Sequence, residues 1–224
     1  MIERLLDLIS PHRCSVCGEN GQILCESCKY DIINEPYEGC LVCQAPVGPR
    51  GICNKCRRKL PIDQAWCVGE RTGGLKRLGD GYKFKSQRAG AVALAELLDE
   101  IIPVLSPAAV IMPIPTSPST IRVRGFDHMR LITLQLAKQR GLHTDQFLER
   151  TTKTTLHFLG RVEREKLGPS LFELKPGVSL PEHIVLIDDI VTTGTTLRAA
   201  TKILKQAGVQ RIDVAVIARQ PFDK

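Results

Sequence analysis

The sequence predicts an α/β protein in which helices cover both faces of a mostly parallel sheet, preceded by a small cysteine-rich domain. Three features predict this arrangement. All nine cysteines lie before residue 68. After that point, continuous apolar runs alternate with amphipathic segments, as expected for buried parallel strands and their covering helices. The segment VLIDDIVTTGTT, residues 185–196, then joins one apolar run to the next helical pattern through two acids and a cluster of threonines.

Length and composition narrow the class of protein. The 224 residues suffice for one α/β core and a smaller unit, and 43% hydrophobic content excludes a mainly disordered chain. The formal charge of +7 suits a phosphate-bearing or nucleic-acid partner, and equally suits a basic protein without one. The N-terminal MIERLLDLISPH fits a short amphipathic helix, lacks the composition of a signal peptide and is too short to span a bilayer. We therefore expect a cytoplasmic protein without membrane insertion.

Eight cysteines form four Cys-x-x-Cys pairs, and Cys67 is left over. Two residues between thiolates is the spacing at which both sulfurs bind one tetrahedral Zn²⁺. Neighbouring pairs would form two structural zinc sites, although a cross-braced pairing uses the same ligands. Disulfides are disfavoured in the cytoplasm, a redox motif needs only one pair, and an iron–sulfur cluster could use the same thiolates. The predicted ligands are Cys14, Cys17, Cys25 and Cys28 for one site and Cys40, Cys43, Cys53 and Cys56 for the other.

The end of the cysteine-rich region marks a domain boundary near residues 60–68. This assigns residues 1–65 to a double zinc-ribbon domain and residues 66–224 to the α/β domain. Bound metal would lower the positive charge, because four thiolates outweigh one divalent ion. Any nucleic-acid surface must then come from local basic patches.

Periodicity predicts the elements of the second domain. Apolar residues such as Leu94, Leu98 and Ile101 recur on one helical face, Pro115 stops a strand, and Gly141 ends a helix. In order, we expect a helix over Ser86–Ile102, a strand over Ala108–Ile114, a helix over Gly125–Arg140, a strand over His183–Asp188, a helix over Thr195–Ala207 and a strand over Ile212–Ala218.

Parallel sheets bind ligands beyond the carboxyl ends of their strands, which places Asp188 and Asp189 at a ligand site. The residues that follow leave backbone N–H groups and a helix N-terminus to face a phosphate; they are Thr192, Thr193, Gly194, Thr195 and Thr196. The two carboxylates suit vicinal hydroxyls or a magnesium hydration shell. An ordinary strand-to-helix turn explains the threonines but not the adjacent acids. The usual NTPase and dinucleotide fingerprints are absent.

VLIDDIVTTGTT resembles, at every position, the ligand loop of type I phosphoribosyltransferases. With the leading cysteine pairs, nearly the whole chain is similar to the ComF family of bacterial competence and DNA-utilisation proteins. Further segments agree with that family: Tyr82–Lys85, Pro113–Pro115, Arg124–Phe126 and residues 157–164. The chain departs from the family pattern at Asp127-His128, where Asn-Gln is common, and at His157, where Gln is usual. The ligand, or its charge preference, would differ if those positions contact it.

The resemblance implies a type I phosphoribosyltransferase-like fold and specific roles. Asp188 and Asp189 would contact the ribose 2′- and 3′-hydroxyls, and would be the catalytic pair in an active transferase. Residues 192–196 would bind the 5-phosphate, and Mg²⁺ would accompany the diphosphate. The basic candidates for diphosphate or nucleic-acid phosphates are Lys83, Lys85, Arg122 and Arg124, for which a solvated surface position is the alternative. His128 is either a ligand contact or a surface histidine, Trp66 either stacks on a base or is buried, and His143 and His183 are expected to be structural.

Two hypotheses for function follow. The first is a ComF-like protein that binds a phosphoribosyl diphosphate-like ligand with Mg²⁺ and also single-stranded DNA, in contact with proteins of the DNA-uptake machinery. The second is an active phosphoribosyltransferase with an unassigned acceptor. No residue identifies itself as the base for an incoming nucleophile.

Overall fold

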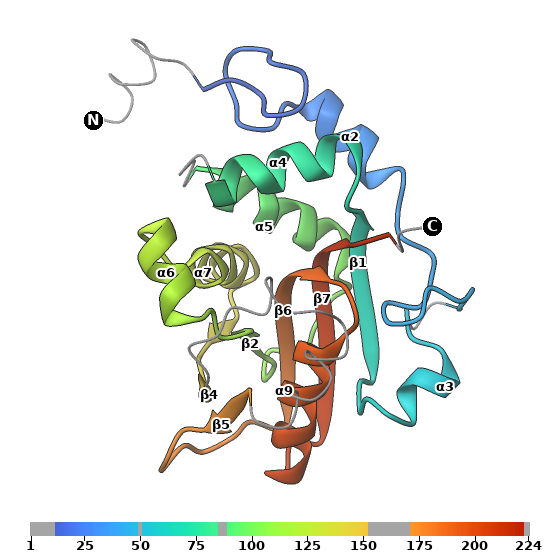
Figure 1. Ribbon diagram of the computed structural model, residues 1–224, viewed down its shortest axis with the longest axis vertical. Coiled ribbons are helices and arrows are strands. Elements are labelled where there is room, and N and C mark those ends of the chain that lie inside the picture. The colour runs from blue at the N-terminus through green and yellow to red at the C-terminus, as the bar shows by residue number, and fades with distance from the viewer. Residues whose placement is uncertain (1–11, 49–50, 85–88, 152–170, 222–224) are drawn as a thin grey trace.

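The computed structural model describes residues 12–48, 51–84, 89–151 and 171–221, and the α/β domain is built on a parallel sheet (Figure 1). The sheet consists of β1 (Gln64–Glu70), β2 (Val110–Pro113), β3 (His143–Thr144), β6 (His183–Val191) and β7 (Arg211–Arg219). Their order is β1-β7-β6-β2-β3, and every neighbouring pair is parallel. The predicted parallel sheet is therefore confirmed. The expected N-terminal helix and the family-like segment 157–164 lie outside the described residues.

The central strand β6 is buried on both faces because its side chains from Ile184 to Ile187, before the acids begin, are all apolar. Val185 and Ile187 of β6 face the core under α4 (Gly73–Phe84), α5 (Gly90–Ile101) and α7 (His128–Arg140). Their neighbours Ile184 and Leu186 face the opposite core, which is covered by α9 (Thr195–Gln206). Alternation along the pleat thus divides one apolar run between two cores.

Several elements differ from the sequence-based expectation. The helix predicted over 125–140 is α7, which begins only at His128. A separate helix that was not expected, α6 (Pro118–Arg124), precedes it and ends at Gly125, which takes a left-handed conformation at φ +75°. Asp127 then caps α7 by accepting from the Arg130 backbone N–H at 3.2 Å. Strand β6 continues past Asp188 to Val191. Strand β1 and helix α4 were not expected; the glycines of α4 hide its periodicity.

A short antiparallel ribbon lies outside the main sheet. Strands β4 (Leu148–Arg150) and β5 (Phe172–Leu174) pair with each other, and β5 packs against α9. In Figure 1 the ribbon lies below α6, next to the carboxyl half of the chain. It carries Arg150 to the end of the sheet where the acids lie.

The two cysteine groups pack against opposite faces of the sheet. Cys14 and Cys28, with α2 (Glu26–Ile33), belong to the core that contains α5. Cys40 and Cys56, with α3 (Asn54–Arg57), belong to the core that contains α9. In Figure 1 the blue segment that carries the first group lies above α4, and the segment that leads into α3 and carries the second group lies beside β1. No helix in the described part of the chain is long and apolar enough to cross a membrane.

Candidate functional site

A cavity of about 140 Å³ lies at the carboxyl ends of β2 and β6. One wall is the chain from Asp188 to Leu197, and another is the turn after β2, from Ile114 to Ser117. The rest of the lining consists of Thr120, Arg124, His128, Met129 and Arg150. The sheet therefore opens where its topology predicts a ligand, and the predicted loop forms much of the surface.

The threonine loop, residues 192–196, has the geometry of an anion-binding site. Gly194 adopts φ +72° as the residue before α9, a conformation that side chains rarely adopt. The N–H groups of the first turn of α9 lack intrahelical acceptors, and the helix dipole adds positive potential there. Thr193 and Thr195 link their hydroxyls at 2.9 Å. The structure brings the whole predicted set, residues 192–196, to the same cavity.

The two acids lie side by side at the cavity but have different partners. Asp189 Oδ2 forms an ion pair with Lys83 Nζ at 2.5 Å and a hydrogen bond with His128 Nε2 at 2.9 Å. Its Oδ1 accepts from the Ile190 backbone N–H at 2.6 Å. Asp188 accepts from the Asp189 N–H at 2.9 Å and forms no ion pair with any described residue. Asp189 is therefore held by the protein, whereas Asp188 is available to a ligand or to a hydrated cation.

This asymmetry separates the two carboxyl pKa values. Burial, reinforced by the neighbouring Asp189 charge, raises the pKa of Asp188 to about 8. Burial alone would also raise the pKa of Asp189, but the Lys83 ammonium and the hydrogen bond with His128 outweigh it and hold that pKa well below its usual value. At neutral pH the pair therefore carries mainly one negative charge, located on Asp189.

His128 and Lys83 have positions that the sequence did not settle. Both side chains are buried, so neither occupies the surface position considered for it. Lys83 lies behind Asp189 and is not among the residues that line the cavity. The Tyr82 hydroxyl donates to the His128 carbonyl at 2.7 Å, which fixes the start of α7 beside the acids. Two basic side chains, Lys83 and His128, therefore contact the single carboxylate of Asp189.

The other candidates lie in several places. Arg124 lines the cavity, whereas Arg122 is exposed and does not line it. Trp66 is half-buried. His183 faces the fully buried Asp213 at 2.9 Å, which agrees with a structural role, and His143 is exposed on β3. Lys85 lies outside the described residues.

Arg150 is a cavity residue that the sequence reasoning missed. It lies 38 positions before Asp188 in the sequence, on a three-residue strand without a clear alternating pattern. A lone arginine after Glu149 has no local signal that distinguishes it from a surface residue. Only the pairing of β4 with β5 brings it to the site.

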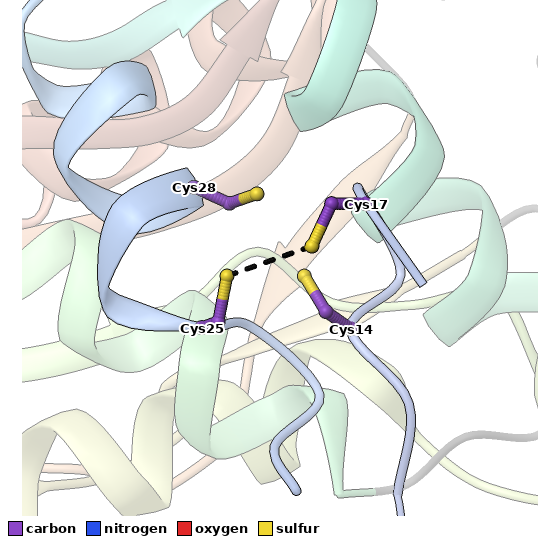
Figure 2. Close-up of side chains that lie close together, drawn as sticks. All are labelled: Cys14, Cys17, Cys25 and Cys28. Atoms are coloured by element: carbon purple, nitrogen blue, oxygen red, sulfur yellow. Dashed lines mark hydrogen bonds between the residues drawn. The ribbon is translucent and has the colours of Figure 1, made fainter. Parts of the chain in front are cut away.

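The cysteine groups have the geometry of two metal centres. In each predicted set of four, all sulfurs lie within 4.8 Å of one another. Cys17 and Cys25 place their sulfurs 3.7 Å apart, and Cys43 and Cys53 place theirs 3.6 Å apart. Four sulfurs about 2.3 Å from a tetrahedral Zn²⁺ lie roughly 3.8 Å apart, so the spacing fits that ion. Figure 2 shows the sulfurs of the first group converging from two loops and the start of α2.

Backbone donors also fit metal-bound thiolates in the second group. The Cys56 N–H donates to Cys53 Sγ at 3.4 Å, and the Cys53 N–H donates to Cys40 Sγ at 3.4 Å. The first of these bonds lowers the pKa of the Cys53 thiol to about 7. The pairing of neighbouring Cys-x-x-Cys motifs holds in the described structure, and a cross-braced pairing does not occur.

The second cysteine group directly supports the threonine loop. A Cβ at Gly194 would lie 3.4 Å from Val42 Cγ2, which belongs to the turn between Cys40 and Cys43. Arg219, at 1% exposure, donates to the carbonyls of Val42 and Val191. The loop that faces the cavity therefore packs against the second cysteine group rather than against solvent.

The chain is similar to known proteins both over its carboxyl-terminal segment and over most of its length. The family model described as phosphoribosyl transferase domain matches residues 152–224. Competence protein ComFC of Streptococcus pneumoniae is 35% identical over 107 residues, 47% of this chain and 46% of that protein. DNA utilization protein YhgH of Salmonella typhi is 28% identical over 217 residues, 92% of this chain and 89% of that protein. Competence protein F of Haemophilus influenzae is 28% identical over 225 residues, 92% of this chain and 96% of that protein.

Proposed function

This chain belongs to the ComF family and has a type I phosphoribosyltransferase-like α/β domain, and on that premise we propose that it binds a phosphoribosyl diphosphate-like ligand in a competence or DNA-utilisation role. One observation carries the proposal. The threonine loop and the acidic pair line the same cavity, so a phosphate and a ribose can be bound together.

The two ends of the site have different tasks in this proposal. The N–H groups at the start of α9 and the threonine hydroxyls bind the 5-phosphate. The carboxyl groups of Asp188 and Asp189 accept hydrogen bonds from the ribose 2′- and 3′-hydroxyls. Because Lys83 and His128 hold Asp189, its carboxylate is oriented before the ribose arrives. Preorganisation of this kind reduces the entropy lost on binding.

Magnesium belongs to the same proposal. Hard oxygen ligands suit Mg²⁺, which usually keeps several waters and binds through one or two carboxylates and the substrate phosphates. Asp188 fits this requirement because it lines the cavity and has no cation paired with it among the described residues. When bound, the ion would neutralise the diphosphate. The chain's own contribution is to orient the ribose and to hold the 5-phosphate.

A binding titration tests the proposal. Phosphoribosyl diphosphate and Mg²⁺ are titrated into the metal-loaded full chain by calorimetry, and we expect a single site. Thr195→Val and Asp188→Asn should each weaken that binding by about tenfold or more, because each removes a hydrogen bond to a charged or polar ligand group. Arg77→Gln, an exposed change on α4 away from the cavity, is the matched control. No saturable binding by the unaltered chain would overturn the proposal.

The proposal also includes binding of single-stranded DNA, contact with uptake proteins and a cytoplasmic location. The competence names of the relatives support a DNA-related role, and the net charge of +7 suits a nucleic-acid partner. Affinity for a single strand should fall steeply as salt rises, because phosphate contacts release counterions. Fluorescence anisotropy with a labelled oligonucleotide at 50 and 200 mM salt measures this. Absence of affinity at low salt would remove DNA from the proposal.

Zinc is the metal proposed for the two cysteine groups. Elemental analysis of the purified chain should give about two zinc per chain, since each group supplies four thiolates. Iron in place of zinc, together with visible absorption, would instead identify clusters.

Active phosphoribosyl transfer is a second candidate, favoured by the family match over residues 152–224. In that case Asp188 and Asp189 would stabilise the ribose as positive charge develops at its anomeric carbon. Incubation with phosphoribosyl diphosphate, Mg²⁺ and a panel of nucleobases separates the candidates. Base-dependent release of diphosphate would establish transfer, and its absence alongside measurable binding would leave a binding protein.

A further inference from the structure

A long groove lies between β1 and the linker that joins the two cysteine groups, residues 34–39. β1 is the last strand of the sheet, and in Figure 1 the chain that leads from α2 toward α3 runs along its outer side. The groove has two parts, of about 860 Å³ and about 630 Å³, which meet at Tyr37, Glu38 and Gly39. Each part is several times larger than the ligand cavity of about 140 Å³, so the groove has room for a segment of a macromolecule.

The larger part of the groove is mainly apolar. Its lining includes Trp66 of β1 and Ile101 at the end of α5, together with Pro46 and Val47 from the loop inside the second cysteine group. Trp66 packs against the core that contains α5 but is only half-buried, so part of this residue is left for a partner. Tryptophan is enriched among the residues that dominate binding energy at protein interfaces. This part of the groove therefore suits an apolar side chain of a protein partner.

The smaller part of the groove is acidic. Four exposed carboxylates line it, and they come from α2, the linker and the end of β1: Asp31, Glu35, Glu38 and Glu70. None of the four forms an ion pair with another described residue. Arg77 is the only cation among the described residues that line this part. The carboxylates are therefore available to basic groups from outside the chain.

Acids on the neighbouring surfaces do have basic partners. Glu100 lies 3.0 Å from Lys29, and Asp80 lies 2.6 Å from Arg71. The chain carries a net charge of +7 and yet leaves the carboxylates of the groove unpaired. A hollow lined by charges of one sign concentrates their potential and attracts ligands of the opposite sign. The same potential repels phosphates, so this groove suits neither a nucleic acid nor a sugar phosphate.

We propose that this groove is a docking site for an extended protein segment in which basic residues stand next to an apolar one. The basic side chains lie in the acidic part and the apolar side chain contacts Trp66, because the two parts are continuous. A small polycation would use the acidic part alone and would leave the apolar part empty. The inference deepens the protein contact named in the proposed function and does not depend on the ligand cavity.

Labelled peptides test the proposal on the metal-loaded full chain. The probe has seven residues, the length of β1, with three lysines followed by a leucine and a valine. We expect saturable binding by fluorescence anisotropy, and weaker binding as salt rises, because ion pairs at exposed positions are screened. A peptide with glutamates in place of the lysines, and one with serines in place of the apolar residues, should each bind about tenfold more weakly or worse.

Trp66 provides an independent readout, because it is the only tryptophan of the chain. The probe contains no tryptophan, so a change in tryptophan emission on binding reports contact with the apolar part. We expect this change with the probe and none with the serine peptide. Binding of the probe without any change in emission would mean that it docks elsewhere and would overturn the proposal.

Matched charge reversals locate the site. Glu35→Lys with Glu38→Lys reverses two acids of the groove, and Glu149→Lys with Glu173→Lys reverses two exposed acids of the β4–β5 ribbon that line neither part. The groove variant should lose about tenfold or more of its affinity for the probe, because like charges then face each other. The ribbon variant has the same net charge and should change by less than about twofold. Zinc content and thermal unfolding check that both variants are folded.

Three results would overturn the proposal: no saturable binding of the probe by the unaltered chain, equal losses in the two variants, or full competition by a single-stranded oligonucleotide. A dimer in sedimentation velocity that the groove variant abolishes would also overturn it, and would assign the groove to a second copy of this chain. Phosphoribosyl diphosphate is titrated into the groove variant in parallel, and its affinity should not change. Loss of the peptide site alone therefore leaves the proposed ligand standing.

Discussion

Arg219 of β7 donates to the Val42 carbonyl of the second cysteine group at 3.1 Å and to the Val191 carbonyl at the end of β6 at 2.9 Å. The side chain is almost fully buried, and burial lowers the pKa of its guanidinium. One residue therefore joins a predicted metal module to the strand that leads into the threonine loop. Because a structural metal contributes to folding, the two sites should be coupled.

Metal loss from the second group should affect the ligand site more than metal loss from the first. Cys43→Ser and Cys17→Ser are matched changes, since both sulfurs are exposed members of their groups. Each should lower the zinc content by about one per chain. We expect a clear loss of phosphoribosyl diphosphate affinity only for Cys43→Ser, measured by calorimetry beside elemental analysis. Equal affinities for the two variants would contradict the coupling.

The stability of the ligand-free protein should fall as pH rises through the window set by Asp188. Its folded pKa, about 8, lies above the usual value of 3.8, so the folded state binds a proton that the unfolded state has lost. Stability therefore decreases from about pH 4 to pH 8, on the order of 1 kcal/mol per pH unit. Asp189 has the opposite shift, so its contribution is present above its unfolded pKa and is lost only as pH falls further.

Urea unfolding of the unaltered chain and of Asp188→Asn at pH 5, 6.5 and 8, without Mg²⁺, measures this effect. The difference in unfolding free energy between the two proteins should shift in favour of Asp188→Asn as pH rises. A difference that is constant across the three pH values would show that Asp188 ionises normally.

Removal of Lys83 should be more damaging than removal of both Lys83 and its partner. Lys83→Met leaves Asp189 buried beside Asp188 without its ammonium, which should cost about 3–5 kcal/mol. The double variant Lys83→Met with Asp189→Asn removes both charges and should recover much of that loss. Denaturant unfolding of the two single variants and the double variant completes the cycle. Additive losses would mean that the pair is not coupled.

Gly194→Ala should weaken ligand binding, whereas Gly141→Ala should not. Both glycines have positive φ, at +72° and +63°, so both substitutions carry a similar backbone strain. The strain at Gly194 falls on the loop that lines the cavity, where the new methyl group would also lie in van der Waals contact with Val42 at 3.4 Å, whereas Gly141 does not line the cavity. We expect both variants to lose about 1 kcal/mol of stability, and only Gly194→Ala to lose phosphoribosyl diphosphate affinity.

The sequence by itself determined the features that depend on near neighbours in the chain. Four Cys-x-x-Cys pairs specify eight metal ligands, because each knuckle is built within a few residues, whereas the structure decided which pairs share a site. The run from Val185 to Thr196 specifies a buried strand, a pair of acids and a phosphate-type loop in one continuous segment. The sheet itself follows from apolar runs that only a two-sided core can bury.

Tertiary structure alone decided which residues meet across the fold. Lys83 and His128 reach Asp189 from α4 and α7, and Arg150 reaches the cavity from a ribbon that no local pattern marks. The support of Gly194 by Val42 spans more than 150 positions of sequence. Such contacts are set by how helices and strands pack, and packing depends on the whole core rather than on the spacing of residues along the chain. The residue types of the ligand loop are therefore set by a contiguous stretch of sequence. Its charge balance and its packing support are set by residues that are distant in the sequence.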